Sequence, residues 1–194
     1  MKLEKEEADY VATLFPEVED IKQTNLRQKV IEAWIRGWRY GGWKLIEDIP
    51  YAPEIPKIFN VEHTRAVTRL PAEIARILKK DYNPDVNLDF VIAGALLHDV
   101  GKTLEYVDCA KEHIVKGPKA GRLIPHSISG VYLAMEVGVP LEVVLIIPHV
   151  IGETLVKTLE ANIVKYANNL IADAVMKKEL GIMQDEYVKK FMKL

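Results

Sequence analysis

The residues best suited to chemistry in this sequence are its histidines together with one aspartate. The five histidines are His63, His98, His113, His126 and His149. All except His113 stand at or next to the end of an apolar segment, and His98 and Asp99 directly follow the apolar residues 90–97. Burying two such groups costs several kcal/mol unless they are paired or bound to a metal. Because divalent transition metals prefer carboxylate and neutral imidazole ligands, the pattern predicts a metal site.

The motif around this pair resembles a known family. Residues 97–102 read Leu-His-Asp-Val-Gly-Lys, and with the other histidines they resemble the HD-domain superfamily of metal-dependent phosphohydrolases over about residues 61–175. In that family the first histidine, the His-Asp pair and a late aspartate bind one metal, which implies His63, His98 and Asp99 here. Members with two further histidines, spaced as His126 and His149 are, hold a second ion bridged by the same aspartate. The resemblance implies one or two divalent transition metal ions, drawn from Fe, Mn, Co, Ni and Zn.

The last ligand departs from the family pattern. An aspartate is usual there, but aligning residues 163–167 with the family's penultimate helix places Asn168 at its position. At about 100° per residue, Asn168 falls at the edge of the buried stripe of this helix, and Asp173 points toward its polar side. A carboxylate is the better ligand, which favours Asp173, whereas position favours Asn168. We expect Asn168 to be the last ligand and keep Asp173 as the alternative.

The resemblance also implies a reaction. We expect a metal-bound hydroxide to hydrolyse a phosphate mono- or diester in a nucleotide or small phosphorylated metabolite. The catalytic residues would be Asp99, as the bridging ligand, and Lys102, directed at a substrate phosphate. The alternative for Lys102 is a cation that simply favours a helix C-terminus. Weaker candidates for phosphate contacts are Arg65 and three cations of a long loop, Lys116, Lys119 and Arg122.

Two other functions remain open from the sequence. Some two-iron proteins that resemble this superfamily, such as the myo-inositol oxygenases, use the same six-ligand set to activate O₂, and the redox state of the metal distinguishes them. The departure at Asn168 also fits a degenerate, non-catalytic module that binds nucleotides without turnover.

The elements that must position these residues are helical. Apolar residues recur at helical spacing, and the chain lacks Asn-Gly and Asp-Gly hairpin turns. We expect an all-α HD-domain bundle with helices at about residues 5–14, 26–38, 61–80, 87–98, 127–136, 140–147, 155–176 and 185–193. Pro71 predicts a kink or break, and Asn87 or Asp89 can cap the apolar helix. Residues 48–56 and 103–125 are expected to be loops.

The length of 194 residues predicts a single domain, 1–194. Within it, residues 1–56 form a helical extension with a proline-rich loop, and residues 57–194 form the metal-binding core. Five aromatic residues lie in the extension, namely Trp34, Trp38, Tyr40, Trp43 and Tyr51. Core packing is their usual role. If the extension folds over the metal site, Trp43 or Tyr51 could stack on a base.

Composition limits the partners. The formal net charge is −2, and no basic run exceeds two residues, so a duplex nucleic acid or an anionic membrane is not an expected partner. The single cysteine, Cys109, allows no internal disulfide, and residues 1–7 are charged rather than signal-like. We therefore expect a cytoplasmic protein acting on a small phosphorylated substrate, in which a homo-oligomer is possible.

Overall fold

The computed structural model describes residues 4–52, 55, 57–106, 124–152, 158–184 and 186. Its helices agree with the predicted all-α class, and the described residues contain no strand, only an isolated bridge between Pro50 and Phe59. The helices are α1 (Lys5–Leu14), η1 (Pro16–Asp20), α2 (Thr24–Gly41), η2 (Ile46–Asp48), α3 (Asn60–Tyr82), α4 (Leu88–Leu97), α5 (Lys102–Glu105), α6 (His126–Glu136), α7 (Leu141–Val144), α8 (Ile146–Val150) and α9 (Leu159–Leu180).

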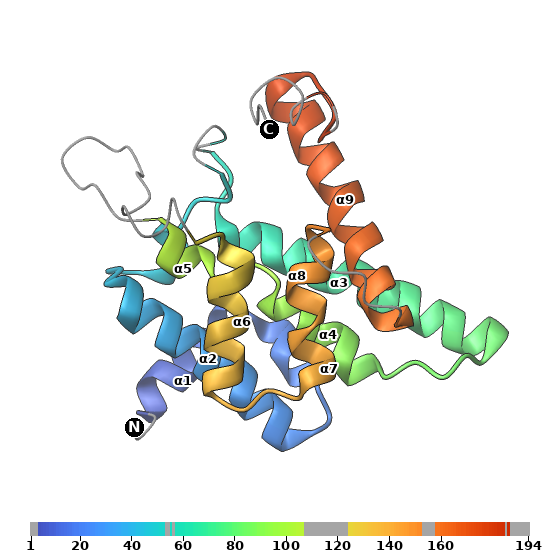
Figure 1. Cartoon of the computed structure of the whole chain (residues 1–194), viewed down its shortest axis with the longest axis horizontal. Coiled ribbons are helices and arrows are strands. Elements are labelled where there is room, and N and C mark those ends of the chain that lie inside the picture. The colour runs from blue at the N-terminus through green and yellow to red at the C-terminus, as the bar shows by residue number, and fades with distance from the viewer. Residues whose placement is uncertain are drawn as a thin grey trace.

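Helix α4 is the centre of the bundle. Its residues are apolar on every side, which is typical of a helix surrounded by others, and it packs against α2, α3, α7, α8 and α9 (Figure 1). The Oδ1 atom of Asn87 accepts a hydrogen bond from the Phe90 amide at 3.3 Å and caps its N-terminus. The alternative cap, Asp89, instead accepts hydrogen bonds from the backbone amides of Lys22 and Gln23. The C-terminus of α4 therefore delivers His98 and Asp99 into the interior.

Helix α3 runs past Pro71 without the expected break. Proline costs about 3 kcal/mol inside a helix because it lacks an N–H and its ring clashes with the preceding turn. Here Val67 and Ala75, on either side of Pro71, are both buried in one cluster with residues of α4 and α9. This packing holds the helix together through the proline.

Other expected boundaries also differ. Residues 140–147 were expected to be one helix but belong to α7 and α8, which meet at Leu145. A continuous helix would need an N–H at position 148 to bond the Val144 carbonyl, and Pro148 has none. Helix α9 starts at Leu159, and α5 occupies the start of the expected 103–125 loop. The expected terminal helix, 185–193, lies almost wholly outside the described residues.

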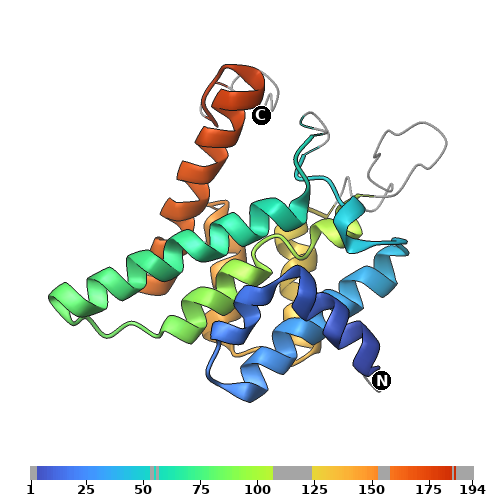
Figure 2. The same cartoon turned by 180° about the vertical axis from the view of Figure 1, so that it is seen from behind.

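The N-terminal extension packs directly on the metal-binding core. Helices η1 and α2 pack against one side of α4, and α1 packs on both of them, as Figure 2 shows from behind. The indole Nε1–H of Trp34 donates to the carbonyl of Leu96 at 3.0 Å, and both residues are fully buried in one apolar cluster. The extension thus forms part of the same core. Among the described residues, no helix combines the length and the apolar character that a membrane crossing requires.

Candidate metal centre

Three predicted ligands meet where α3 begins and α4 ends. One ligand atom each from His63, His98 and Asp99 lies within 4.8 Å of the others. The Nε2 atoms of the two histidines are 3.4 Å apart, and they lie 3.6 Å (His63) and 3.3 Å (His98) from Oδ2 of Asp99. All three side chains are buried. Two imidazoles and a carboxylate at this separation form a site for a divalent cation.

The orientation of His98 is fixed by its own helix. Its Nδ1 lies 2.7 Å from the carbonyl oxygen of Ala95, and since a carbonyl only accepts, Nδ1 carries the proton. In the neutral ring, Nε2 therefore presents a lone pair to His63 and Asp99. This is the arrangement of a metal-ligating histidine whose other nitrogen is held by a backbone carbonyl.

Burial sets the charges of this cluster. Desolvation lowers the pKa of His63 well below its ordinary value, although the charge of Asp99 opposes the shift. Burial would raise the pKa of Asp99, but the charges of His98 and Lys102 outweigh it, and the pKa lies well below its usual range. A neutral His63 and an ionised Asp99 are the protonation states that metal binding requires.

Lys102 is buried beside the same carboxylate. Its Nζ lies 2.7 Å from Oδ2 of Asp99 and donates a hydrogen bond of 2.7 Å to the carbonyl of Tyr51. The ammonium group is also 4.4 Å from the centre of the Tyr51 ring, and that ring packs against His63 with centroids 4.2 Å apart. A helix-end cation would extend into solvent, whereas this lysine places its charge at the metal site.

His126 approaches Asp99 from the opposite side. Its Nε2 is 3.5 Å from Oδ1, the oxygen that does not face His63 and His98. Its Nδ1 is 2.6 Å from a carboxylate oxygen of Glu105, so a neutral His126 directs its lone pair toward Asp99. The approach depends on Gly101, where a Cβ atom would lie 1.9 Å from the His126 carbonyl oxygen.

His149 is buried on α8, with Nε2 3.1 Å from Oδ1 of Asn162 on α9. Neither His149 nor His126 belongs to the group of ligand atoms within 4.8 Å of one another in the described part of the chain. His126 therefore contacts Asp99 but lies outside the cluster of His63, His98 and Asp99.

The two candidates for the last ligand lie in different places. Oδ1 of Asn168 is 3.1 Å from Nε2 of His63, and the residue is buried. Asp173 instead accepts a hydrogen bond from the backbone amide of Gln184 at 2.8 Å. Of the two candidates, Asn168 is the residue that lies at the cluster, and its role as a ligand stays a prediction.

The remaining candidates lie elsewhere. Arg65 pairs with Glu17 at 3.0 Å rather than facing the ligands. Trp34 packs in the core, the indole of Trp43 donates to the carbonyl of Thr103, and Tyr40 bonds Glu136 at the surface. Trp38 donates to the Trp43 carbonyl. Lys116, Lys119 and Arg122, together with Cys109 and His113, lie outside the described residues.

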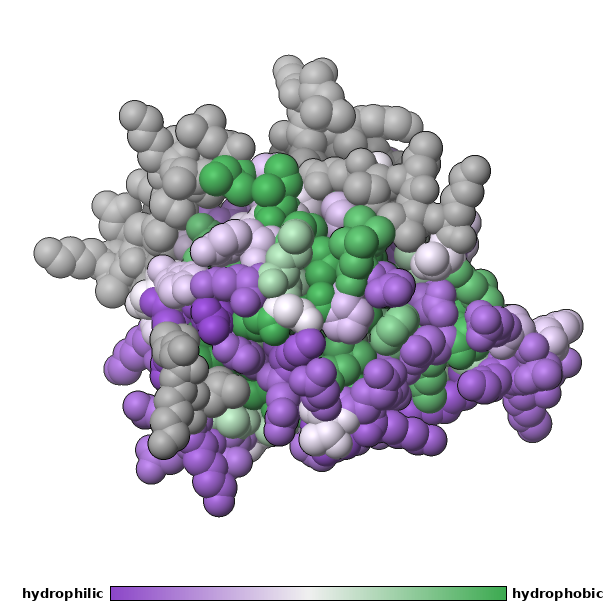
Figure 3. Space-filling model, turned by 60° about the horizontal axis from the view of Figure 1, so that its bottom comes forward, coloured by the Kyte–Doolittle hydropathy of each residue, from purple (hydrophilic) through white to green (hydrophobic). Residues whose placement is uncertain are grey.

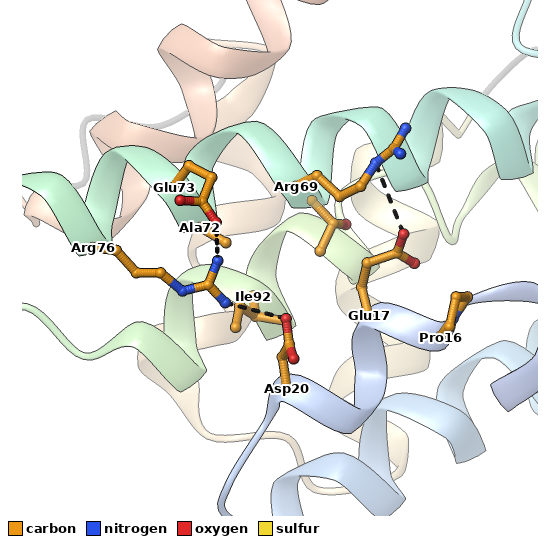
Figure 4. A pocket seen from close by; sticks show the side chains of 9 residues that line it. Pro16, Glu17, Asp20, Arg69, Ala72, Glu73, Arg76 and Ile92 are labelled. Carbon is orange, nitrogen blue, oxygen red and sulfur yellow. Dashed lines mark hydrogen bonds and ion pairs between the residues drawn. The ribbon is translucent and has the colours of Figure 1, made fainter.

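A cavity of about 470 Å³ lies between η1 and α3, and Ile92 of α4 also lines it (Figure 4). Its walls include Glu17, Asp20, Arg69 and Arg76, none of which is a predicted metal ligand. Arg76 pairs with Asp20 at 3.1 Å and with Glu73, and Arg69 lies 3.9 Å from Glu17. The charged side chains that line the cavity are thus paired with one another.

Three residues of the site were not predicted. Glu105 fixes His126, Asn162 contacts His149, and the Asn60 side chain donates to the backbone carbonyl of Asp99 at 3.3 Å. Asn60 is the first residue of α3, the helix that carries His63, and this proximity in sequence is the one signal that could have identified it. The other two contacts join separate helices, and no local sequence pattern reports them.

The donor set fits a divalent metal ion. Oδ2 of Asp99 faces two imidazoles and the Lys102 ammonium, yet it receives no hydrogen bond of ordinary geometry from the described residues. The Lys102 ammonium compensates part of the charge of this oxygen, and a divalent ion would also engage the two imidazole Nε2 atoms that face it. The residues that would hold the ion are His63, His98 and Asp99.

Comparison with known proteins agrees with this site. The model of the HD domain family matches residues 60–173, which take in every predicted ligand. The dihydroneopterin 2′,3′-cyclic phosphate phosphodiesterase of Methanocaldococcus jannaschii is 29% identical over 192 residues, covering 88% of this chain and 76% of the relative. No solved structure gives a significant match. Because the family model spans more than half of the chain, this protein belongs to the HD domain family and is a metal-dependent phosphohydrolase.

Proposed function

We propose that this phosphohydrolase opens a 2′,3′-cyclic phosphodiester carried by a small heterocyclic compound, such as a pterin or a nucleoside. The relative from M. jannaschii is named for that reaction on dihydroneopterin 2′,3′-cyclic phosphate. Its similarity covers 88% of the chain, more than the 60–173 segment of the family model, so it extends beyond the metal-binding core. The likeness therefore concerns the segments that would surround a substrate as well as the ligands.

The observation that carries this proposal is the position of Lys102 beside the ligand cluster. A divalent ion held by His63, His98 and Asp99 would lower the pKa of a coordinated water and neutralise charge on a phosphoryl oxygen. The Lys102 ammonium, 2.7 Å from Asp99, supplies a further positive charge at the same place. A cyclic phosphodiester carries one negative charge, which this combination of cations complements.

The reaction forms one bond to phosphorus and breaks another. A water oxygen bonds to phosphorus, one ring P–O bond breaks, and the released alkoxide takes up the proton that the water loses. The other proton of the attacking water is released to solvent, so the product is a phosphate monoester with two negative charges. Lys102 stabilises the increase in charge, because a preorganised cation in a buried site interacts strongly with charge that develops during reaction.

The roles of the other ligands are part of the proposal. Asn168 would complete the first metal site through the amide oxygen that lies near His63. His126, on the far oxygen of Asp99, would hold a second ion together with His149. The short contact of His126 with Glu105 supports this role, because metal-ligating histidines commonly donate their other N–H to a carboxylate.

The N-terminal extension would act as one domain with the core. Tyr51 comes from this extension, yet its ring packs on His63 and its carbonyl accepts from Lys102. Tyr51 therefore supports the ligand cluster, and the stacking of Tyr51 or Trp43 on the heterocycle of a substrate stays a prediction.

The test is turnover of defined substrates by protein loaded with Fe(II) or Mn(II). We expect dihydroneopterin and nucleoside 2′,3′-cyclic phosphates to be converted to monoesters, observed by ³¹P NMR, without release of inorganic phosphate. Asp99→Ala, purified in parallel, is the control for a contaminating enzyme. Release of inorganic phosphate from monoesters with intact cyclic substrate would contradict the proposal and indicate a phosphomonoesterase.

One observation favours a second candidate, a module that binds nucleotides without turnover. An amide at position 168 is a weaker ligand than the carboxylate usual at that position. The same experiment separates the two, because the non-catalytic module would bind the cyclic phosphate in calorimetry and leave its ³¹P signal unchanged.

A further inference from the structure

Helices α6 and α7 carry large apolar side chains on their outer side. We call Ile128, Tyr132, Met135, Leu141 and Leu145 the α6–α7 face. The first three follow the i, i+4, i+7 spacing of one side of a helix, and the last two are likewise one turn apart. Exposed fractions are 55% for Ile128, 54% for Tyr132, 60% for Met135 and 59% for Leu141. This side of α6 thus lacks the polar surface that covers an ordinary amphipathic helix.

The two helices are neighbours, so their exposed side chains form one surface. They contact each other and lie together at the front in Figure 1. In Figure 3 apolar surface gathers in the upper and middle part of the view, and hydrophilic surface covers the lower part. The opposite side of α6, including Leu133 and Ala134, is buried in the core. Helix α6 is therefore apolar on two sides, and the core covers one of them.

The α6–α7 face carries few charges. Residues 126–135 contain no Lys, Arg, Asp or Glu, and α7 adds one exposed carboxylate, Glu142. Glu136, at the end of α6, is held away by Arg36 at 2.8 Å and by the Tyr40 hydroxyl. Such a surface does not select an acidic or basic partner. It suits a two-fold interface, in which the same patch meets itself and any charge would be opposed by its own copy.

The area of this face matches what a dimer needs. Half-exposed side chains of this size each leave on the order of 100 Å² accessible, so the five present roughly 500 Å². A standard interface buries about 800 Å² per partner, and homodimer interfaces are about 65% apolar, which amounts to roughly 500 Å² of apolar surface. The exposed pair Tyr166 and Leu170 on α9 has two side chains instead of five and therefore offers a smaller apolar area.

We propose that a second copy of this chain covers the α6–α7 face and that the protein is a two-fold symmetric dimer. The interface would lie on the helix that begins with His126, with the contact side of α6 facing away from its buried side. Association would thus hold α6 from both sides and fix the end that approaches Asp99.

The experiment is sedimentation velocity on the full chain with matched charge variants. The wild type is expected to sediment with twice the chain mass of 22.0 kDa. Tyr132→Lys and Met135→Lys place like charges in the interface and should weaken the dimer by at least about 100-fold, giving the single-chain mass. Leu170→Lys introduces the same charge at an equally exposed site on α9, and it should leave the dimer intact.

Circular dichroism and thermal unfolding show whether each variant is folded. Because the substituted side chains are more than half exposed, we expect the folded helix content to remain. Met135→Gln keeps the size of the side chain without adding a charge, and it should also raise the dissociation constant of the dimer. This variant tests the interface even if a lysine variant unfolds. A monomeric wild type, lysine and glutamine variants that associate as tightly as the wild type, or a dimer dissociated by Leu170→Lys would overturn the proposal.

Discussion

The Nζ atom of Lys102 lies 2.7 Å from Oδ2 of Asp99, and both side chains are buried. The same carboxylate oxygen is 3.3 Å from His98 and 3.6 Å from His63. Asp99 therefore joins the metal ligands to the one lysine that the described residues bring to this site. This relationship places a buried ammonium group beside the metal ligands, and Lys102 and Asp99 each give a separate prediction.

Lys102→Ala should lower kcat/KM by roughly 10²–10³ and leave the metal content unchanged, because it removes one preorganised charge but no ligand. Lys102→Arg should restore activity only in part, since the planar guanidinium does not replace a compact ammonium in a buried space. Steady-state kinetics with metal analysis checks both results. Lys178→Ala, at a surface ion pair, is the control. Kinetics like those of the control would mean that Lys102 serves only the structure.

Asp99→Ala should abolish both metal binding and turnover, and it should lower the free energy of unfolding by about 3–5 kcal/mol. The loss of stability arises because the substitution leaves the buried Lys102 ammonium without its carboxylate. The double variant Asp99→Ala/Lys102→Met removes the stranded charge, so it should regain most of the stability while remaining inactive. Urea denaturation of the metal-free proteins measures this difference. A double variant no more stable than Asp99→Ala would show that the ion pair is not the cause.

Asn168→Asp should tighten metal binding by more than about tenfold, because it replaces a neutral amide oxygen near His63 with a carboxylate. Asn168→Leu should weaken it. Asp173→Asn is the matched control, since its carboxylate bonds the Gln184 amide and not the cluster. Competition with a chromophoric chelator gives the affinities. Should Asp173→Asn weaken the metal while both variants at 168 leave it unchanged, the assignment of Asn168 would be wrong.

The stability of the metal-free protein should fall as the pH drops below about 6.5. Burial lowers the pKa of His63, so below this pH the unfolded chain takes up a proton that the folded chain does not bind. One such proton contributes up to about 1.4 kcal/mol per pH unit. The pKa of Asp99 is also lowered, and its contribution is lost only below the ordinary carboxyl range. Urea denaturation at several pH values measures the effect.

The control for this prediction is His63→Gln. Its free energy of unfolding should depend less on pH between pH 6.5 and 5 than that of the wild type. Equal slopes in the two proteins would show that His63 does not titrate between the folded and unfolded states as its burial requires.

Much of the fold was predictable because it rests on local patterns. The apolar residues 90–97 predicted a helix with His98 and Asp99 at its end, and the structure confirms this. The motif glycine, Gly101, is explained by a contact that no local pattern contains, the carbonyl of His126 in the space a Cβ would fill. Helical register placed Asn168 ahead of Asp173, and its role as a ligand stays a prediction.

The residues that surround the ligands were not predictable in the same way. Tyr51 reaches His63 and Lys102 from a proline-rich segment without helical periodicity. Glu105 meets His126 across 21 residues of sequence. Such contacts depend on how helices pack, because polar pairs on separate elements carry no shared spacing. The prediction of a break at Pro71 was wrong for a related reason. Tertiary packing of α3 outweighed the local tendency of proline to end a helix.

The most direct test of a metal-dependent phosphodiesterase at His63, His98 and Asp99 is to restore activity to metal-stripped protein by stepwise addition of Mn(II) or Fe(II). Hydrolysis of a 2′,3′-cyclic phosphate should be absent without metal and should rise with each addition until it saturates at one or two ions per chain. His98→Ala should gain no activity at the same metal concentrations. Full activity of the stripped protein, or full restoration in His98→Ala, would contradict the assignment of this site.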